Sequence, residues 1–261
     1  MTRPPALAST AAALEQASAA GPYFTIQPCF SGSGWRPLSA LISDPAALRG
    51  RVSRVRGVLA RQAAIDPGDV EERVAASTLF LGLASQLVSP VLGAAVVGGV
   101  VPRLALADLW WRPTESGVWP LAAGPIGSSA VGQLGCDREL REAAALVSEQ
   151  GHDLTGPLAA AFGAAFRLSQ QVLRGNAASA LAGAAAVLAV TFPRRAETAG
   201  RLTAHVLAAG WLRGSGRYVR PDPGQPRWFL ERRSCCLLYR LPGAGLCGDC
   251  VLRARSANPA N

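Results

Sequence analysis

Four of the six cysteines in this 261-residue chain lie close together near the C-terminus. Cys235 and Cys236 are adjacent, ten residues follow, and Cys247 and Cys250 then form a Cys-x-x-Cys pair. Four thiolates saturate either a tetrahedral zinc ion or a two-iron, two-sulfur cluster. Because thiolates prefer soft or borderline metals, this set of ligands excludes calcium and magnesium. We therefore predict that these four cysteines bind zinc or an iron-sulfur cluster.

The spacing of the four cysteines bears on which metal they bind. Structural zinc sites usually present two separated Cys-x-x-Cys pairs, and here only Cys247 and Cys250 have that spacing. In an extended chain neighbouring side chains point to opposite faces, so Cys235 and Cys236 are poorly placed to chelate one ion. A cluster with two irons, or a locally distorted backbone, would resolve this conflict. The spacing favours an iron-sulfur cluster over zinc, with a disulfide between the adjacent cysteines as a third alternative.

The other residues with chemical potential have simpler structural explanations. Cys29 and Cys136 have no partner nearby in the sequence and are expected to be small buried residues. His152 and His205, the only histidines, lie in predicted helices, where we expect them to cap or pack. A Gly-x-Gly-x-x-Gly pattern at 243–248 lacks the strand and helix of a dinucleotide-binding fold. No catalytic residue is therefore predicted beyond the metal centre.

The composition indicates a folded protein with an uneven charge distribution. Hydrophobic residues make up 49% of the chain and charged residues 16%, which excludes a disordered chain. The net charge is +9, and the segment 211–255 holds nine arginines but only Asp222, Glu231 and Asp249. No nucleic-acid-binding motif accompanies this charge. We expect the basic segment to attract an acidic protein or an anionic ligand, and not a nucleic acid.

Two segments raise the question of a membrane. The N-terminus resembles a secretory signal only weakly, because Pro4 and Pro5 come early and Glu15 interrupts the apolar run. The stretch 74–101 has no charge and is long enough to span a bilayer, but Ser89-Pro90 divides it. We predict two buried core helices there. We also predict a cytoplasmic protein, whose reducing surroundings favour metal-bound cysteines over disulfides.

Helix punctuation dominates the first 210 or so residues. Asp44-Pro45 and Asp66-Pro67 each supply a cap and a first-turn proline, so each is expected to start a helix. Gly175-Asn176 is expected to close one helix and cap the next. The further predicted helices cover 137–149, 157–174, 177–190 and 195–212.

Strand patterns are short and few. Aromatic and β-branched runs over 104–113 and 117–124 predict a hairpin, with Trp110, Trp111 and Trp119 as its core aromatics. The stretch 228–241 is also strand-like. The patterns together predict an α+β fold that is mainly helical. We divide the chain into a helical domain, 1–212, and a C-terminal metal-binding segment, 213–261.

The C-terminal segment resembles a known protein family. Arg-Ser-Cys-Cys-Leu-Leu-Tyr-Arg over 233–240, followed by Cys-Gly-Asp-Cys over 247–250, is similar to the C-terminal signature of the FhuF-like ferric-siderophore reductases. All four cysteine positions and both intervals agree with that signature. The segments 175–183 and 108–112 also resemble actinobacterial members of the family. The resemblance covers the last fifth of the chain well and the remainder by general pattern.

The resemblance implies a [2Fe-2S] cluster held by Cys235, Cys236, Cys247 and Cys250. It implies an oxidoreductase that reduces iron(III) chelated by a siderophore, most naturally one of the hydroxamate type, so that iron(II) is released. No nicotinamide or flavin signature is present, so we expect an external electron donor such as a ferredoxin. A monomer is expected, and peripheral membrane contact is left open. The alternatives are a non-enzymatic module stapled by zinc and a siderophore-related protein without redox activity.

Residues around the cysteines are expected to set the potential of such a cluster. Arginine side chains at 232, 233 and 240 would favour the reduced, more negative state. Backbone N–H groups around Gly243, Gly245 and Gly248 are expected to donate hydrogen bonds to the sulfurs. The residues that bind the chelate are not identified at this stage.

Overall fold

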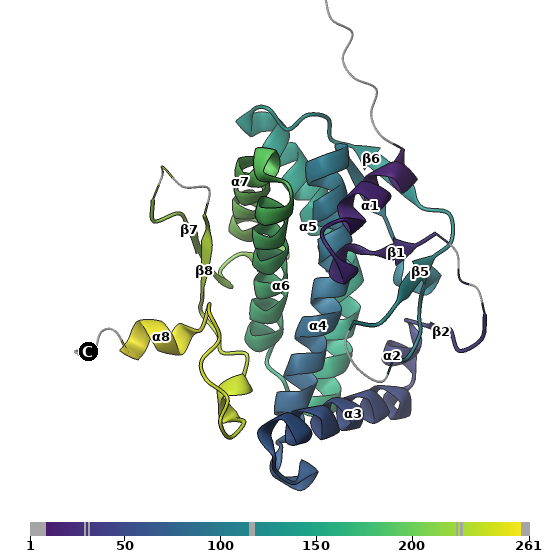
Figure 1. Cartoon of the computed structure of the whole chain (residues 1–261), viewed down its shortest axis with the longest axis vertical. Helices are drawn as coiled ribbons and strands as arrows, with labels where there is room; N and C mark the ends of the chain where they lie inside the picture. The colour runs from purple at the N-terminus through teal and green to yellow at the C-terminus, as the bar shows by residue number, and fades with distance from the viewer. Residues whose placement is uncertain are drawn as a thin grey trace, which may run out of the picture.

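The computed structural model describes residues 9–28, 30, 32–114, 118–222, 224 and 227–256, with 254–256 as backbone only. Cys29, which we expected to be buried, lies outside the described residues. Long helices form the body of the protein, and short strands lie at its edges (Figure 1). The prediction of a mainly helical α+β fold is confirmed.

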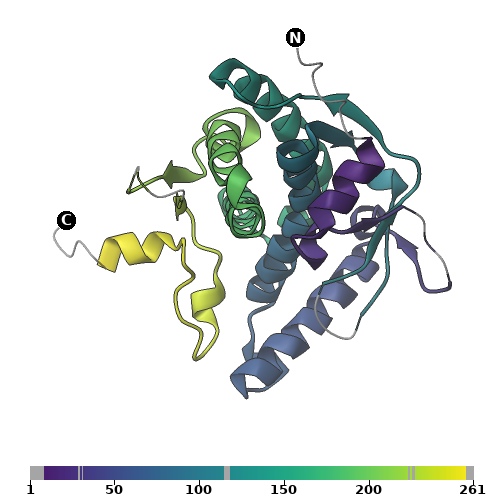
Figure 2. The same ribbon diagram turned by 45° about the horizontal axis from the view of Figure 1, so that its top comes forward.

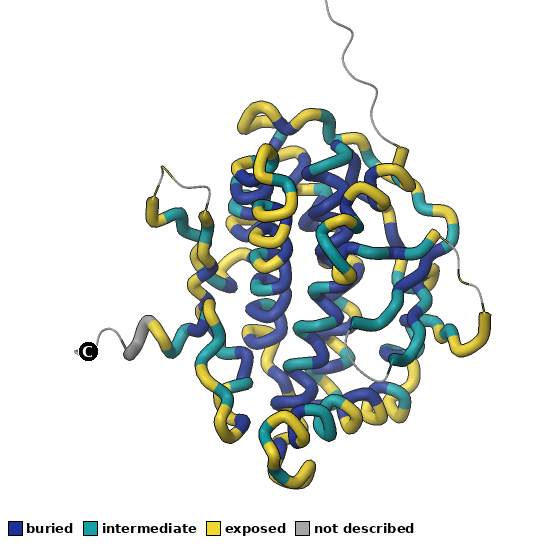
Figure 3. The backbone as a smooth tube through the Cα atoms, viewed as in Figure 1, coloured by how far each residue is buried: buried dark blue, intermediate teal, exposed yellow. Residues whose placement is uncertain are grey.

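The helical body is built around α4. This helix (Glu72–Gly93) packs against α3 (Pro45–Ala63), α5 (Asp137–Phe166) and α6 (Gln170–Thr191), and α7 (Ala196–Ala208) covers α5 and α6. Figure 3 shows burial concentrated where these helices face one another. Shorter helices are α1 (Thr10–Ser18) and α2 (Ala40–Ser43). Asp44 caps α3 as predicted, accepting from the N–H groups of Ala46 and Ala47.

The apolar stretch 74–101 does not divide at Ser89-Pro90, as we had expected. Helix α4 continues through Pro90 to Gly93, and a π-helical turn (Ala94–Gly98) follows. Pro90 is buried among the packed helices, so tertiary contacts offset the hydrogen bond that its missing N–H removes. Helices Glu72–Gly98 and Gln170–Thr191 are long and apolar enough to cross a membrane. However, 83% and 61% of their apolar windows are buried inside the protein. The first value supports the prediction that the stretch 74–101 belongs to the core.

Three other helix boundaries also differ from the predicted ones. Helix α5 runs without a break through Pro157 and ends at Phe166, and the capping residue Arg167 has a left-handed φ of 52°. Ser169 then caps α6 by accepting from the N–H of Val172, so Gly175-Asn176 lies inside this helix. Asp66 caps only a 3-10 turn, Pro67–Asp69, before α4 begins.

The predicted hairpin is confirmed. Strand β4 (Leu109–Trp111) pairs antiparallel with β5 (Leu121–Ala123), in a four-stranded sheet ordered β1-β5-β4-β2. The ring of the buried Trp111 stacks on Trp119 with centroids 4.3 Å apart, and the Arg51 guanidinium lies 4.3 Å from the Trp111 ring centre. Trp110 is half-buried. The remaining strands of the body are β1 (Ile26–Gln27), β2 (Arg36–Pro37), β3 (Val100–Arg103) and β6 (Gly127–Ala130), the last two paired with each other.

The C-terminal segment lies beside the helical body, against α4, α6 and α7 (Figures 1 and 2). Strand β7 (Gly216–Val219) pairs antiparallel with β8 (Phe229–Arg232). We expected the strand to continue through the adjacent cysteines, but β8 ends at Arg232. A loop with one 3-10 turn (Leu238–Arg240) and a short helix, α8 (Val251–Ser256), follow. The division of the chain near residue 213 stays a prediction.

Candidate metal centre

Two loops of the C-terminal segment bring the four clustered cysteines together. The N–H of Arg232 donates to the carbonyl of Asp249 at 3.2 Å, which ties the end of β8 to the second loop. The N–H of Cys250 donates to the carbonyl of Cys247 at 3.2 Å, closing the tight turn between them. The sulfurs of Cys236 and Cys247 are 3.6 Å apart.

The four thiols meet as two pairs. Cys236 contacts Cys247. Cys235 lies near enough to Cys250 for that thiol to raise its pKa. Cys236 and Cys250 are buried, whereas Cys235 and Cys247 are partly exposed. Leu237, directly after the adjacent pair, has a left-handed φ of 71°. The backbone is therefore locally turned, which resolves the conflict that an extended chain would impose on adjacent cysteines.

The donor set fits a [2Fe-2S] cluster. Such a cluster takes four thiolates, shared between its two irons, and the two loops bring four thiols into one region, with Cys236 and Cys247 in contact. Which individual cysteines bind the irons stays a prediction.

The environments of the thiols differ in a way that affects their protonation. The hydrogen bond between the thiols of Cys236 and Cys247 lowers the pKa of Cys236 to about 6, and the Leu238 N–H and the charge of Arg232 act in the same direction. The same hydrogen bond raises the pKa of Cys247, and burial raises the pKa of Cys235. Cys236 is thus the thiol most readily available as a thiolate, the form that binds metal.

The hydrogen bonds to sulfur come from a different part of the loop than we expected. The N–H of Leu237 donates to the sulfur of Cys235 at 3.2 Å, and the N–H of Leu238 donates to Cys236. We had expected the N–H groups around Gly243, Gly245 and Gly248 to donate these hydrogen bonds. In the described segment, Leu237 and Leu238 donate them instead. The reason is the left-handed turn at Leu237, which points successive N–H groups back toward the cysteines.

Arg232 places a buried positive charge beside the cysteines. Its side chain is 3% exposed, and it donates to the Oδ1 of Asn176 at 2.7 Å and to the Oγ of Ser179 at 3.1 Å. Ser179 in turn donates to the carboxylate of Asp249. The other two arginines from which we expected an effect differ: Arg233 is exposed, and Arg240 forms an exposed ion pair with Glu71. Of the three, Arg232 has the strongest electrostatic effect because water screens it least.

Helices α4 and α6 hold the loop that carries the adjacent cysteines. Asn176, fully buried on α6, donates to the carbonyl and the hydroxyl of Ser77 at 3.0 and 2.9 Å. Ser77, on α4, donates to the carbonyl of Cys236 at 2.7 Å. A Cβ atom on Gly175 would overlap the hydroxyl of Ser234, so the loop packs directly on the backbone of α6.

Sequence reasoning did not assign these supporting residues. The sequence predicted Gly175-Asn176 as a helix boundary and showed a family resemblance over 175–183, but it assigned no contact with the cysteine loop to Asn176 or Ser77. A signal was present, since Asn176 is an amide within a helix of small apolar residues. Buried polar side chains nearly always have hydrogen-bond partners, so such a residue indicates a contact with another segment.

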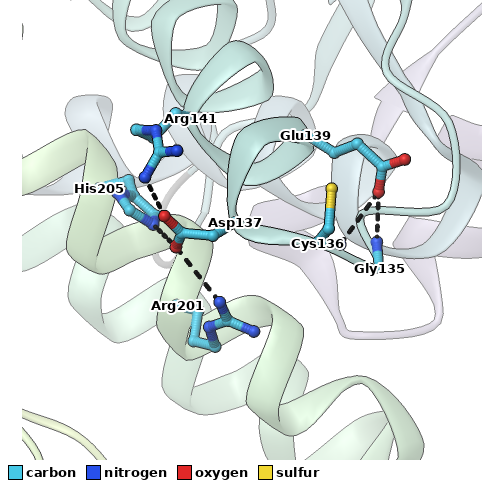
Figure 4. Close-up of polar contacts among 7 residues, drawn as sticks. All are labelled: Gly135, Cys136, Asp137, Glu139, Arg141, Arg201 and His205. Carbon is cyan, nitrogen blue, oxygen red and sulfur yellow. Dashed lines mark hydrogen bonds and ion pairs between the residues drawn. The ribbon is translucent and has the colours of Figure 1, made fainter.

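The two histidines and Cys136 take no part in the metal centre. His152 packs as predicted, its ring tilted against Trp211 with ring centres 5.3 Å apart. His205 instead lies 3.0 Å from the carboxylate of Asp137, a pairing that we had not predicted (Figure 4). Cys136 is exposed, and our expectation that it is buried was wrong. It occupies the cap position of α5, where Glu139 folds back to accept from its N–H at 3.1 Å, so the chain there lies at the surface.

A protein-family model matches part of the chain. The family model described as "FhuF 2Fe-2S C-terminal domain" matches residues 232–252, a range that contains the four clustered cysteines and Arg232. No curated protein matches the chain. The resemblance found in the sequence is confirmed over these residues, and with it the assignment of a [2Fe-2S] cluster as the cofactor.

Proposed function

We propose that this chain, whose residues 232–252 form an FhuF-type 2Fe-2S C-terminal domain, is a cytoplasmic ferric-siderophore reductase. The observation that carries the proposal is the match of the family domain to a segment that holds four thiols, two of them in contact. A redox role follows from the type of cofactor. That the substrate is a ferric siderophore goes beyond this redox role, and the match to the family domain supports it.

The proposed reaction needs one electron and no acid or base. Siderophores hold iron(III) through hard oxygen donors, and iron(II), which is softer, binds such donors far less well. When bound, the cluster supplies a one-electron carrier between a donor protein and the chelated iron. Reduction of iron(III) to iron(II) then releases the metal without cleavage of the siderophore.

The residues of the chain position the carrier and adjust its potential. Ser77 and Asn176 fix the loop of the adjacent cysteines on the helical body. Arg232 contributes a buried positive charge, which favours the more negative, reduced state. The partly exposed Cys235 and Cys247 leave one side of the centre near the surface, where an electron can enter or leave.

The electron donor is proposed to be a small acidic protein such as a ferredoxin. Exposed arginines next to the cysteines, among them Arg233 and Arg253, give this side of the protein a positive charge. Complementary charge speeds the encounter of such partners, and salt weakens it.

Anaerobic purification tests whether the protein binds a [2Fe-2S] cluster, on which the proposal depends. The expected protein is red-brown, holds about two irons and two acid-labile sulfides per chain, and gives a paramagnetic resonance signal after one-electron reduction. Mixing the reduced protein with a ferric trishydroxamate should reoxidise the cluster and yield iron(II). A colourless protein with one zinc and no labile sulfide would instead identify a zinc-stapled module.

A further inference from the structure

An open groove lies between the helical body and the C-terminal segment. Its volume is about 770 Å³, within the range of roughly 300–1,000 Å³ that is common for small-molecule sites. Helices α4 and α6 form its floor, Phe229 of β8 and Tyr23 form walls, and the turn Gly248-Asp249 lies at one side. A smaller hollow of about 210 Å³ also has Tyr23 and Gly183 in its lining, so the space extends along α6.

The floor of the groove includes two glycines, one on each helix. Gly82 on α4 and Gly183 on α6 both line it, as does Ala182. A Cβ atom added to Gly82 or to Gly183 would meet no atom within 4 Å, so neither glycine is required by close packing of the protein itself. These glycines therefore leave room for a bulky molecule over the two helices.

The groove reaches the metal centre through one short turn. Gly248 and Asp249 are the two residues between Cys247 and Cys250, and both line the groove. Two other hollows, of about 300 and 520 Å³, lie beside α7 and beside α1, and no residue of the cysteine loops lines them. A molecule in the groove would thus lie next to the predicted cluster ligands, as transfer of an electron requires.

The charges around the groove favour an uncharged occupant. Asp249 and Arg253 are the two charged residues in its described lining, and they have opposite charges. Arg233 and Arg240 do not line the groove. A cluster with four thiolate ligands is net negative in both oxidation states, so it repels polyanionic complexes such as ferric catecholates. The exposed rings of Tyr23 and Phe229, 40% and 49% accessible, can pack against apolar arms of a chelate.

We propose that this groove, floored by Gly82 and Gly183 and bounded by Gly248-Asp249, binds the ferric chelate as an uncharged complex. The inference rests on the proposed function and adds the location of the substrate. In the step that follows, one electron leaves the reduced cluster, which returns to its oxidised form, and the bound iron(III) becomes iron(II). No covalent bond of the siderophore breaks, and the donor protein restores the electron.

Binding and reduction can be measured separately with gallium. A gallium(III) trishydroxamate has the shape and charge of the ferric complex but accepts no electron, so calorimetric titration of the holoprotein reports binding alone. We expect Gly183→Leu and Gly82→Leu to weaken this binding at least tenfold, because each side chain would fill the floor. Gly50→Leu, at an exposed glycine of α3 with no neighbour within 4 Å, should bind as the wild type does.

The iron content and the cluster potential of each variant show whether the metal centre stays intact. Unchanged binding in both groove variants, with the cluster intact, would overturn the proposed site while leaving the proposed function standing. Conversely, a wild-type protein that binds the gallium complex but does not reduce the ferric one would overturn the function and retain the site. A ferric tris-catecholate should reoxidise the cluster more slowly than the trishydroxamate, and equal rates would contradict the charge argument.

Discussion

The guanidinium of Arg232 donates to the side-chain oxygen of Asn176 across 2.7 Å, and both side chains are buried. This bond joins the strand that leads into the cysteines to the middle of α6. The same Asn176 holds Ser77, which in turn holds the carbonyl of Cys236. The metal centre is therefore supported by the helical body, and changes in that body should alter the cluster.

Replacing Arg232 should lower the reduction potential. A unit charge about 8 Å away interacts by roughly 2 kcal/mol at an effective dielectric of about 20. That energy corresponds to a shift on the order of 50–100 mV for one electron, so we expect Arg232→Met to lower the potential by this amount in a spectroelectrochemical titration. Arg232→Lys, which keeps the charge, should have a reduction potential close to that of the wild type. The exposed Arg233→Met is the matched control, and an equal shift there would contradict the account.

A methyl group at Gly175 should displace the cysteine loop. The Cβ atom would overlap the Ser234 hydroxyl and lie 2.8 Å from Arg232, although alanine is the better helix former. We expect Gly175→Ala to lose much of its iron during purification while its circular dichroism stays helical. Gly183→Ala, on the same helix with free space around the added atom, should keep its iron. Full iron retention in Gly175→Ala would show that the loop does not pack as described.

Removal of the Ser77 hydroxyl should loosen the cluster. Ser77→Ala leaves the carbonyl of Cys236 and the amide of Asn176 each short of a partner, at a cost of about 1–3 kcal/mol. Iron should therefore pass to an external chelator faster than in the wild type. The neighbouring Thr78→Ala removes only a hydroxyl bonded within α4, so its rate of iron loss should be nearly unchanged.

Single serine substitutions test the four predicted ligands. We expect Cys235→Ser, Cys236→Ser, Cys247→Ser and Cys250→Ser each to reduce the iron and labile sulfide bound per chain, because serine is a harder ligand than thiolate. Cys136→Ser should bind the normal amounts, since Cys136 is exposed at the start of α5. A variant among the four with a normal cluster spectrum would remove that cysteine from the set of ligands.

The contacts of Asp137 predict a pH-dependent contribution to stability. The hydrogen bond with His205, together with Arg141 and Arg201, holds the pKa of Asp137 below its usual value of 3.8. A carboxylate with a lowered pKa stabilises the fold above the unfolded pKa and loses that effect as the pH falls through the folded one. Asp137→Asn should thus lower Tm at pH 7 but leave it unchanged near pH 2. Asp153→Asn, exposed on the same helix, should have little effect at either pH.

Local signals predicted the elements whose ends depend on nearby residues. The cap at Asp44 and the hairpin around Trp110 and Trp111 are examples, because each depends on hydrogen bonds or pairing between near neighbours. The helix boundaries that we predicted at Pro90 and Pro157 were wrong. Both prolines lie inside helices, since packing of long helices against one another offsets the single hydrogen bond that each proline removes.

The sequence by itself determined the chemistry of the metal centre. Four thiols at that spacing select soft metals, and the adjacent pair identifies the family domain. Tertiary structure alone decided what surrounds them. Arg232 lies 56 residues from Asn176, and Ser77 lies 159 residues from Cys236. These contacts cannot be predicted from a local sequence pattern, because they form only when α4, α6 and the cysteine loop pack together. Packing buries their polar groups, and buried polar groups nearly always form hydrogen bonds.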